Sequence, residues 1–499
     1  MNRREFLKLG LAAPLILKAC KDPVRTALRD PGASSSMPPT EGIDVTAEWR
    51  ALYARAAPGT EYRRGQVAAS ALKVLPVESK IAGYSMRLPA AHPIPTPAVH
   101  GGRVYVSGGF GSKQYFCLDA ATGKQLWGVD LSDDGPSTAA IEDGYVVMNT
   151  ESCTIFTLDA GTGEMAWSWW LGDPLMSSPT IAKGRVFSSY PANGRAHHRE
   201  ASHLLGCFEL KTGKILWQRW IDGDAISAPV ASGDEVVVAT FSGTVFRFHQ
   251  ESGEARSVLK ARATSAPVVV GEEMHFSRRA ETQGSPQEGL CLWNNGSNRM
   301  EKQYQVRDAK YLDGHVQTAT AYAATGKVLD SGNGFSGGAP SEANAGAAFG
   351  NVGQGSVSTL QGFQGSRILR YGDSNVACMG DEIVCNGARD GKKRWSVPFK
   401  GDLAKLGGSL AAPPVAAGRS LFVVGLDGRL IQLDPADGSR RRDWEIGHPV
   451  RYAPTVEAGR VFVGTQDGLL VCVDTGDTRN SGWPQWGRDA QRTGTYSPP

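Results

Sequence analysis

Short apolar runs separated by turn residues follow one another along most of the chain. From about Pro95 these runs lie roughly 10 residues apart, and Gly, Asp or Asn stands between them. Runs of this length, bounded by residues that favour turns, are typical of β-strands. The pattern therefore predicts a mostly β chain from this point onward.

A longer unit repeats on top of this strand pattern. It is clearest in Leu118–Trp127, which reads L-D-A-A-T-G-K-Q-L-W: a Gly closes a tight turn and a Trp follows four residues later. The clean copies of this pair are Gly123 and Trp127, Gly163 and Trp167, Gly213 and Trp217, and Gly391 and Trp395. Weaker copies of the turn lie at Gly253, Gly296, Gly438 and Gly476. With one exception the turns are 38 to 50 residues apart, and units of four strands at this period predict the blades of a β-propeller.

The ends of the repeat predict how the ring closes. Lys80–Leu88 looks like a fourth strand without the first three, and the last unit, Val450–Asp474, looks like three strands without a fourth. Tyr84 also precedes the next Pro-containing strand at nearly the same distance as Trp167 does. We therefore expect an all-β fold, an eight-bladed β-propeller of four-stranded W-motif blades over residues 79–480, closed by the N-terminal strand.

The exception in the spacing is an interval of 95 residues between Gly296 and Gly391. A ninth blade is one explanation, because Tyr322–Lys327 echoes the repeat. However, Gly326 comes only 30 residues after Gly296, which is too close for another full blade. We expect instead a long insertion, residues 307–360, which is rich in Gly, Ala, Ser and Asn.

The first 20 residues have the pattern of an export signal. Arg3 and Arg4 precede an apolar run of nine residues, far fewer than the roughly 20 that span a bilayer. The paired arginines resemble a bacterial twin-arginine signal, which exports folded proteins. Leu17–Cys20 resembles a lipobox, in which Cys20 is lipidated and becomes the mature N-terminus. Lys18 departs from that pattern, and an ordinary cleavage site nearby is the alternative.

Three further segments complete the predicted organisation. Residues 21–44 are rich in Pro, Ser and Gly and are predicted to be a flexible linker. Residues 45–78 form an N-terminal extension, with a short helix expected over Val45–Ala57, where apolar residues recur at helical spacing before Pro58. Residues 481–499 are a C-terminal tail.

The charge is nearly balanced. The chain has 53 basic and 50 acidic residues and a net charge of +3. No broad electrostatic attraction to nucleic acid or to an anionic surface follows from this balance. We therefore predict no nucleic-acid partner.

The repeat resembles that of the pyrroloquinoline-quinone (PQQ) enzymes. The residues that carry the resemblance are Leu118–Trp127, Leu158–Trp167 and Lys211–Trp217, and it extends over about residues 79–480. It implies an eight-bladed propeller in which each Trp packs between neighbouring blades. The family contains quinoprotein dehydrogenases and non-catalytic propellers of the BamB type, and the fold does not choose between them.

A cofactor is not predicted from this resemblance. Quinoprotein alcohol dehydrogenases typically carry an adjacent Cys–Cys disulfide near the PQQ, and this chain has no Cys-Cys pair. Their Ca²⁺ is held by carboxylate and amide oxygens, and no residues of this chain can be matched to those ligands. PQQ with Ca²⁺ therefore belongs only to the alternative function.

Five of the eight cysteines lie on the predicted third strand of a unit, and two of them, Cys291 and Cys472, come just before a shortened turn. Cys117, Cys207 and Cys385 each lie six residues before their turn Gly, which indicates packing of a small apolar residue. Cys378 and Cys385 flank a predicted turn. Two alternatives follow: they face each other and form a disulfide in an oxidising envelope, or the strand register leaves them diagonal.

Two other patterns do not support a ligand site. His197, His198 and His203 lie close together, but no Cys or carboxylate framework accompanies them, so we predict no metal site. A Gly-x-Gly-x-x-Gly pattern over residues 332–337 lacks the strand and helix that dinucleotide binding requires.

The interruptions of the repeat point to function. Residues 191–203 and 280–288 each follow a second strand, and residues 307–360 connect two blades; in a four-stranded meander these connections emerge on one face. We therefore predict a non-catalytic scaffold of the bacterial envelope, periplasmic and lipid-anchored, that binds other envelope proteins through this face. The alternative is a periplasmic PQQ-dependent or other oxidoreductase that uses the central funnel, and an enzyme acting on another ligand such as a carbohydrate is a third hypothesis.

Overall fold

The structure is a computed structural model. It describes residues 65–151, 154–171, 177–192, 201–282, 285–308, 351, 368–401, 409–479, 482–483 and 487–494. The signal segment with Cys20, the linker and the helix predicted over Val45–Ala57 lie outside these residues. Within the part of the chain that is described, no helix is long and apolar enough to cross a membrane.

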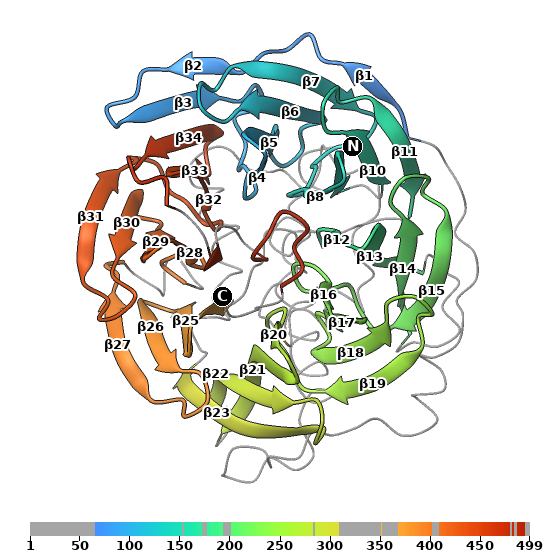
Figure 1. Cartoon of the computed structure of the whole chain (residues 1–499), viewed down its shortest axis with the longest axis vertical. Helices are drawn as coiled ribbons and strands as arrows, with labels where there is room; N and C mark the ends of the chain where they lie inside the picture. The colour runs from blue at the N-terminus through green and yellow to red at the C-terminus, as the bar shows by residue number, and fades with distance from the viewer. Residues whose placement is uncertain are drawn as a thin grey trace, which may run out of the picture.

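Eight antiparallel sheets stand around a common axis, so the predicted all-β, eight-bladed propeller is confirmed (Figure 1). In blades 1 to 7 the four strands run in chain order from the axis to the rim, and in blade 8 the first three strands do so while the fourth comes from the N-terminal side of the chain.

The first four blades are continuous in sequence. Blade 1 contains β4 (Ala98–His100), β5 (Arg103–Ser107), β6 (Gln114–Asp119) and β7 (Gln125–Leu131); blade 2 contains β8 (Ala140–Glu142), β9 (Tyr145–Asn149), β10 (Thr154–Asp159) and β11 (Met165–Trp170). Blade 3 contains β12 (Thr180–Ala182), β13 (Arg185–Pro191), β14 (His203–Glu209) and β15 (Ile215–Ile221); blade 4 contains β16 (Val230–Ser232), β17 (Glu235–Ala239), β18 (Thr244–His249) and β19 (Ala255–Lys260).

The second half of the ring follows the same plan. Blade 5 contains β20 (Val268–Val270), β21 (Glu273–Thr282), β22 (Ser285–Asn294) and β23 (Arg299–Asp308); blade 6 contains β24 (Leu369–Tyr371), β25 (Ser374–Met379), β26 (Glu382–Gly387) and β27 (Lys393–Pro398). Blade 7 contains β28 (Val415–Ala417), β29 (Ser420–Val424), β30 (Arg429–Leu433) and β31 (Arg440–Glu445); blade 8 contains β32 (Thr455–Glu457), β33 (Arg460–Gly464), β34 (Leu469–Asp474) and β3 (Gly83–Arg87).

Blade 8 closes the ring as the sequence predicted. Its outer strand β3 comes from the N-terminal side of the chain and pairs along its whole length with β34, Gly83 opposite Val473 and Arg87 opposite Leu469. The two ends of the repeat are thus joined by a main-chain ladder, which stabilises the ring against opening at this blade.

Three short strands add to this plan. β1 (Val67–Ala69) pairs with the rim strand β7, and β2 (Leu75–Val77) pairs with β3, so the N-terminal segment runs around the outside of blades 1 and 8. β35 (Gly482–Trp483) pairs with the innermost strand β28 of blade 7. None of these was expected from the repeat, because a strand of two or three residues has no periodicity that the sequence can show.

The repeated Trp residues connect neighbouring blades, as the resemblance implies. Each indole Nε1 donates a hydrogen bond to a backbone carbonyl of the next blade: Trp127 to Ala160 (3.1 Å), Trp167 to Leu210 (2.6 Å), Trp217 to Gln250 (2.9 Å) and Trp395 to Pro435 (3.0 Å). The turn Gly of the next blade lies against the ring, and a Cβ on Gly213 would come within 2.6 Å of Trp167. This turn therefore needs Gly both for its positive φ of 72° and for the space.

The carbonyl groups that accept these indole hydrogen bonds differ in the number of other donors around them. The Ala160 carbonyl also accepts from Arg103 (2.8 Å) and Tyr105 (3.2 Å), whereas the Leu210 carbonyl accepts only from Trp167 among the described residues. At the closing interface Tyr84 takes the place of Trp, and its hydroxyl donates to the Ala120 carbonyl at 3.2 Å.

The cysteines on the third strands are buried free thiols. These are Cys117, Cys207, Cys291, Cys385 and Cys472. Burial raises the pKa of the Cys117 thiol to about 12, so it stays protonated and packs as a small apolar side chain.

Cys378 and Cys385 are diagonal rather than opposed. The register pairs Cys378 with Ile383 and Cys385 with Val376, and both thiols are free. The Cys378 thiol instead donates to the Ala412 carbonyl at 2.9 Å. The geometry corresponds to the diagonal alternative, and we do not propose the disulfide further.

Candidate functional site

The described ends of the three insertions lie on one face of the disc. Antiparallel pairing makes the second and fourth strands of a blade end on the same side. β13 ends at Pro191, β21 at Thr282 and β23 at Asp308, and each of these strands is a second or a fourth strand. We call this side, with its second-to-third-strand turns and its blade-to-blade connections, the insertion face. Residues 193–200, 283–284, 309–350 and 352–367 lie outside the described part of the chain.

The second insertion, residues 280–288, was predicted only as an interruption after a second strand, and it consists of extended strands instead of an irregular loop. β21 and β22 pair without a break from Glu273 opposite Asn294 to Thr282 opposite Ser285, and β23 accompanies them as far as Asp308. Polar residues conceal the strand pattern here, but the main-chain ladder does not depend on side-chain polarity. Blade 5 therefore carries a sheet extension on the insertion face.

Buried charges fix the base of this extension. Arg278, Arg279 and Glu288 are all buried. The Arg278 Nε donates to the Ala261 carbonyl at 3.0 Å, and Arg279 lies 3.6 Å from Glu288. Thr264 donates to Glu288 at 3.0 Å. Removing one partner from a buried pair leaves a charge without compensation. This network therefore holds the extension in one position, above the boundary between blades 4 and 5.

The long insertion returns to the same place. Asn351 is its described residue, and its side-chain nitrogen donates to the Ala263 carbonyl at 2.6 Å in the connection between blades 4 and 5. Gly243 lies beneath it, where a Cβ would be 3.0 Å from the Asn351 Oδ1. The second and third insertions are thus both attached to the insertion face at blades 4 and 5.

Two aspartates hold the neighbouring connections. Asp222, at the end of blade 3, accepts hydrogen bonds from Thr240 (2.7 Å) and Thr244 of blade 4. It also forms an ion pair with Lys260 (2.9 Å). Asp133 accepts in the same way from Thr150 (2.8 Å) and Thr154 (2.7 Å). These contacts were not predicted from the sequence. The available signal is a Thr-x-x-x-Thr turn preceded by an Asp 17 or 18 residues earlier.

One buried carboxyl group on this face titrates near neutrality. Burial, and then the negative charge of Asp134, raise the pKa of Glu151 to about 7, although the Gly111 amide donates to it at 3.3 Å. Gly135 lies directly against the side chain, where a Cβ would come within 2.1 Å of it. Glu151 therefore joins three segments of blades 1 and 2 at a point where its charge depends on pH.

The chain itself enters the axis of the ring. Residues 487–494 form a turn at the centre of the disc (Figure 1). Inner strands of three blades bind this turn: the amide of Ile141 donates to Ala490 O (2.8 Å), that of Ile181 to Gln491 O (2.9 Å) and that of Val269 to Gly494 O (3.2 Å).

The axial turn is anchored by a buried guanidinium. Arg492 is fully buried and donates through Nε to the Ala139 carbonyl at 2.7 Å. Burial lowers the pKa of Arg492 to about 9. We call residues 487–494 the axial plug. The C-terminal tail was predicted only as a tail, since nothing in its composition distinguishes a buried turn from an exposed one.

The described residues do not fit PQQ with Ca²⁺. A Ca²⁺ site needs several convergent oxygen ligands, and no group of three or more His, Cys, Asp or Glu side chains suited to a metal occurs within the described ranges. The axial plug also lies at the centre of the ring, where its carbonyls are hydrogen-bonded to the inner strands of three blades. We therefore derive no reaction step through this cofactor.

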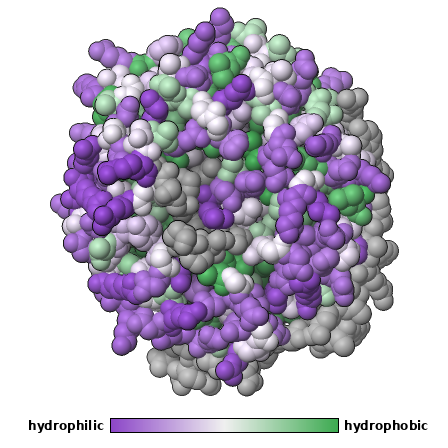
Figure 2. All heavy atoms as spheres, viewed as in Figure 1, coloured by the Kyte–Doolittle hydropathy of each residue, from purple (hydrophilic) through white to green (hydrophobic). Residues whose placement is uncertain are grey.

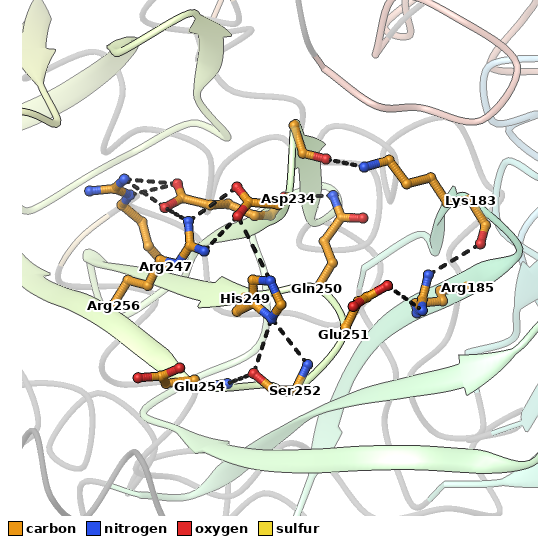
Figure 3. A network of polar contacts seen from close by, with 12 residues as sticks. Lys183, Arg185, Asp234, Arg247, His249, Gln250, Glu251, Ser252, Glu254 and Arg256 are labelled. Atoms are coloured by element: carbon orange, nitrogen blue, oxygen red, sulfur yellow. Dashed lines mark hydrogen bonds and ion pairs between the residues drawn. The ribbon is translucent and has the colours of Figure 1, made fainter.

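The opposite face carries a network of exposed ion pairs around blades 3 and 4 (Figure 3). Arg256 pairs with Asp234 at 2.6 Å, Arg185 with Glu251 at 3.1 Å, and Lys183 donates to a backbone carbonyl across the blade boundary. Exposed pairs are typically worth about 0–1 kcal/mol each. This face provides matched control positions rather than a site.

Of the predicted histidine cluster, His203 is the described residue. It is fully buried at the start of β14, and burial lowers its pKa to about 4, so it is neutral. His197, His198 and the Gly-rich pattern of residues 332–337 lie outside the described residues.

The fold and repeat define this chain as a PQQ-like eight-bladed propeller, and comparison of sequences gives the family. The model of the family described as outer membrane protein assembly factor BamB matches residues 78–183, 174–303 and 376–495. The chain belongs to this family. No curated protein matches it in sequence.

Solved structures with a similar fold include proteins of different kinds. BamB from Moraxella catarrhalis is 15% identical, with a TM-score of 0.46, over 80% of this chain and 97% of that chain. The quinohemoprotein alcohol dehydrogenase ADHIIG from Pseudomonas putida HK5 is 13% identical, with a TM-score of 0.48, over 79% of this chain and 76% of that chain. Sqt1 from Saccharomyces cerevisiae is 10% identical, with a TM-score of 0.49, over 77% of this chain and 96% of that chain.

Proposed function

We propose that this propeller is a non-catalytic scaffold of the bacterial envelope that holds a partner protein on its insertion face. The observation that carries the proposal is the gathering of all three interruptions on one face, with two of them fixed at their bases by buried polar contacts. Connecting segments that interrupt the repeat of a rigid scaffold are where binding residues concentrate. The family description, which names an outer membrane assembly factor, supports a partner in the envelope.

The proposed location follows from the N-terminal sequence. Arg3 and Arg4 indicate twin-arginine export, and Cys20 is proposed as the lipidated residue that anchors the chain on the periplasmic side. Mass spectrometry of the mature protein tests this, since an unmodified N-terminus elsewhere than Cys20 would exclude the anchor.

The test of the scaffold function removes the long insertion and leaves its attachment in place. Residues 309–350 are replaced by a short Gly-Ser linker, so that β23 and Asn351 are kept. We expect an unchanged melting temperature together with loss of the partner that the parent captures from detergent-solubilised envelopes. Arg185→Ala on the opposite face serves as the control and should capture normally. Unchanged capture after the replacement would contradict the proposal.

The oxidoreductase alternative has a separate test. The purified full chain is incubated with PQQ and Ca²⁺, and the absorbance of bound quinone is measured after desalting. The scaffold hypothesis predicts no retained quinone, because the axial plug occupies the centre. Stoichiometric retention would favour the enzyme.

A further inference from the structure

The N-terminal segment forms an apolar belt around the rim. Residues 67–77 read V-A-A-S-A-L-K-V-L-P-V, and nine of these eleven residues are apolar. β1 lies at the outer edge of blade 1 and β2 at the outer edge of blade 8, so the segment follows the rim from one blade to the other (Figure 1). We call residues 67–77 the rim belt.

The backbone of the rim belt is fixed to the propeller. The amide of Ser70 donates to the Gly128 carbonyl at 2.8 Å, and the amide of Val74 donates to the Gln125 side chain at 3.3 Å. Val74 is the buried residue of the belt and packs with Met86. The apolar side chains around it are therefore presented on a defined backbone.

Those side chains face solvent. Leu72 is 46% exposed, Leu75 60% and Val77 36%, and Leu126 on the adjacent strand β7 is 45% exposed. Of the large apolar side chains exposed in the described chain, only Leu216, at 40%, lies elsewhere. The upper edge in Figure 2, where Figure 1 places β2 and β7, shows apolar atoms among hydrophilic ones. A concentrated exposed apolar patch marks a surface that contacts something else.

The charges around the rim belt indicate what it contacts. Lys73, Lys80 and Lys124 are exposed, and none forms an ion pair with a described acidic residue. Glu78 is the acidic residue between the belt and β3. Apolar side chains interleaved with lysines match an anionic phospholipid surface, where the apolar groups enter the headgroup boundary and each nearby lysine is attracted to the anionic headgroups.

Chain continuity points to the same surface. Gly65, just before the rim belt, is hydrogen-bonded to Ser168 at 2.6 Å and lies 45 residues after Cys20. The flexible linker predicted for residues 21–44 alone has a root-mean-square reach of about 25–30 Å. A lipid on Cys20 would therefore keep the belt close to the bilayer.

We propose that the rim belt, together with Leu126 and Lys124, docks on an anionic phospholipid surface. The propeller then stands edge-on, with the insertion face perpendicular to the bilayer and open to a partner beside it. This inference rests on the envelope location in the proposed function and not on the identity of the partner.

The test measures lipid binding without the anchor. The full chain carrying Cys20→Ser is co-sedimented with vesicles of phosphatidylglycerol and phosphatidylethanolamine, and with vesicles of phosphatidylcholine. We expect binding to the anionic vesicles and at least 10-fold weaker binding to phosphatidylcholine. High salt should weaken the binding to the anionic vesicles.

Matched variants distinguish lipid binding through the rim belt from nonspecific lipid binding. Leu72→Ser with Leu75→Ser should weaken binding at least 10-fold, and Lys124→Glu several-fold. Lys214→Glu and Leu216→Ser occupy the corresponding positions of blade 3, where no belt lies, and should bind as the Cys20→Ser parent does.

Three results would overturn the lipid proposal: no binding to anionic vesicles, equal weakening by the blade 3 variants, or a dimer in sedimentation that only the belt variants disrupt. The last result would identify a second copy as the occupant. Partner capture through the insertion face is measured separately, so that failure of one hypothesis is distinguishable from failure of the other.

Discussion

Closure of the ring at blade 8 depends on Gly83, where a single added methyl group should disturb the pairing of β3 with β34. Gly83 is the first residue of β3 and has a φ of 123°, which L side chains rarely adopt. A Cβ at this position would lie 2.0 Å from the carbonyl oxygen of Cys472 on the partner strand. Gly83→Ala therefore forces β3 and β34 apart at the seam of the ring.

The size of the effect follows from a comparison with Gly476. Gly476 also has a positive φ, 72°, but a Cβ there meets nothing within 4 Å. Gly476→Ala should therefore cost only backbone strain, about 1–2 kcal/mol. Gly83→Ala adds the loss of at least two ladder hydrogen bonds at about 1 kcal/mol each, which gives roughly 3–4 kcal/mol in total.

Two measurements distinguish these variants. With an unfolding entropy of about 2 cal/mol/K per residue, a propeller of roughly 400 residues loses about 1 °C of melting temperature per kcal/mol. We expect a decrease of roughly 3–4 °C for Gly83→Ala against 1–2 °C for Gly476→Ala, with faster amide exchange confined to β3 and β34. Equal melting temperatures of the two variants and unchanged amide exchange in β34 would refute closure of the ring by the pairing of β3 with β34.

Three further predictions follow from the contacts described above. Trp167→Phe should destabilise the protein by about 1–3 kcal/mol more than Trp127→Phe in urea unfolding, because the buried Leu210 carbonyl loses its donor whereas the Ala160 carbonyl keeps Arg103 and Tyr105; equal losses would contradict this. The raised pKa of Glu151 makes the folded state lose stability as pH rises from about 4.5 to about 7. Glu151→Gln should therefore have a melting temperature close to that of the parent at pH 5 and a higher one at pH 8. A difference in melting temperature that does not depend on pH would be evidence against this. Deletion of residues 482–499 should accelerate hydrogen exchange of the Ile141 amide by several orders of magnitude through loss of the axial plug, and unchanged protection would place the plug elsewhere.

The repeat was predictable because its chemistry is local. A turn with positive φ requires Gly, and a Trp that bridges two blades recurs at a fixed distance from it, so one unit is enough to define the others. Tyr84 was found by the same spacing, although the residue type differs, because ring closure requires a fourth strand in the last blade.

The features that sequence reasoning missed depend on contacts between distant segments. The axial plug is defined by carbonyls that meet the amides of three blades, and backbone groups leave no trace in residue type. The Asp222 contacts with Thr240 and Thr244 use residues that are common in exposed turns. The polar residues of the blade 5 extension indicated an interruption of the repeat, whereas the register carries the strands through them.

The relation of Cys378 to Cys385 shows the same limit on a small scale. Both residues were placed correctly on neighbouring strands. Whether they face each other depends on a register set by the turn between them, and a shift of a single pair changes the partner of every residue.

Photo-crosslinking in cells tests directly whether a partner protein binds the insertion face. A photoreactive amino acid is placed at Lys113 or Asp427, exposed turn positions on the insertion face, and at Lys183 or Glu251 on the opposite face. We expect a discrete cross-linked envelope protein from the first pair and none from the second. Cross-links from the opposite face alone, or from none of the four positions, would contradict it.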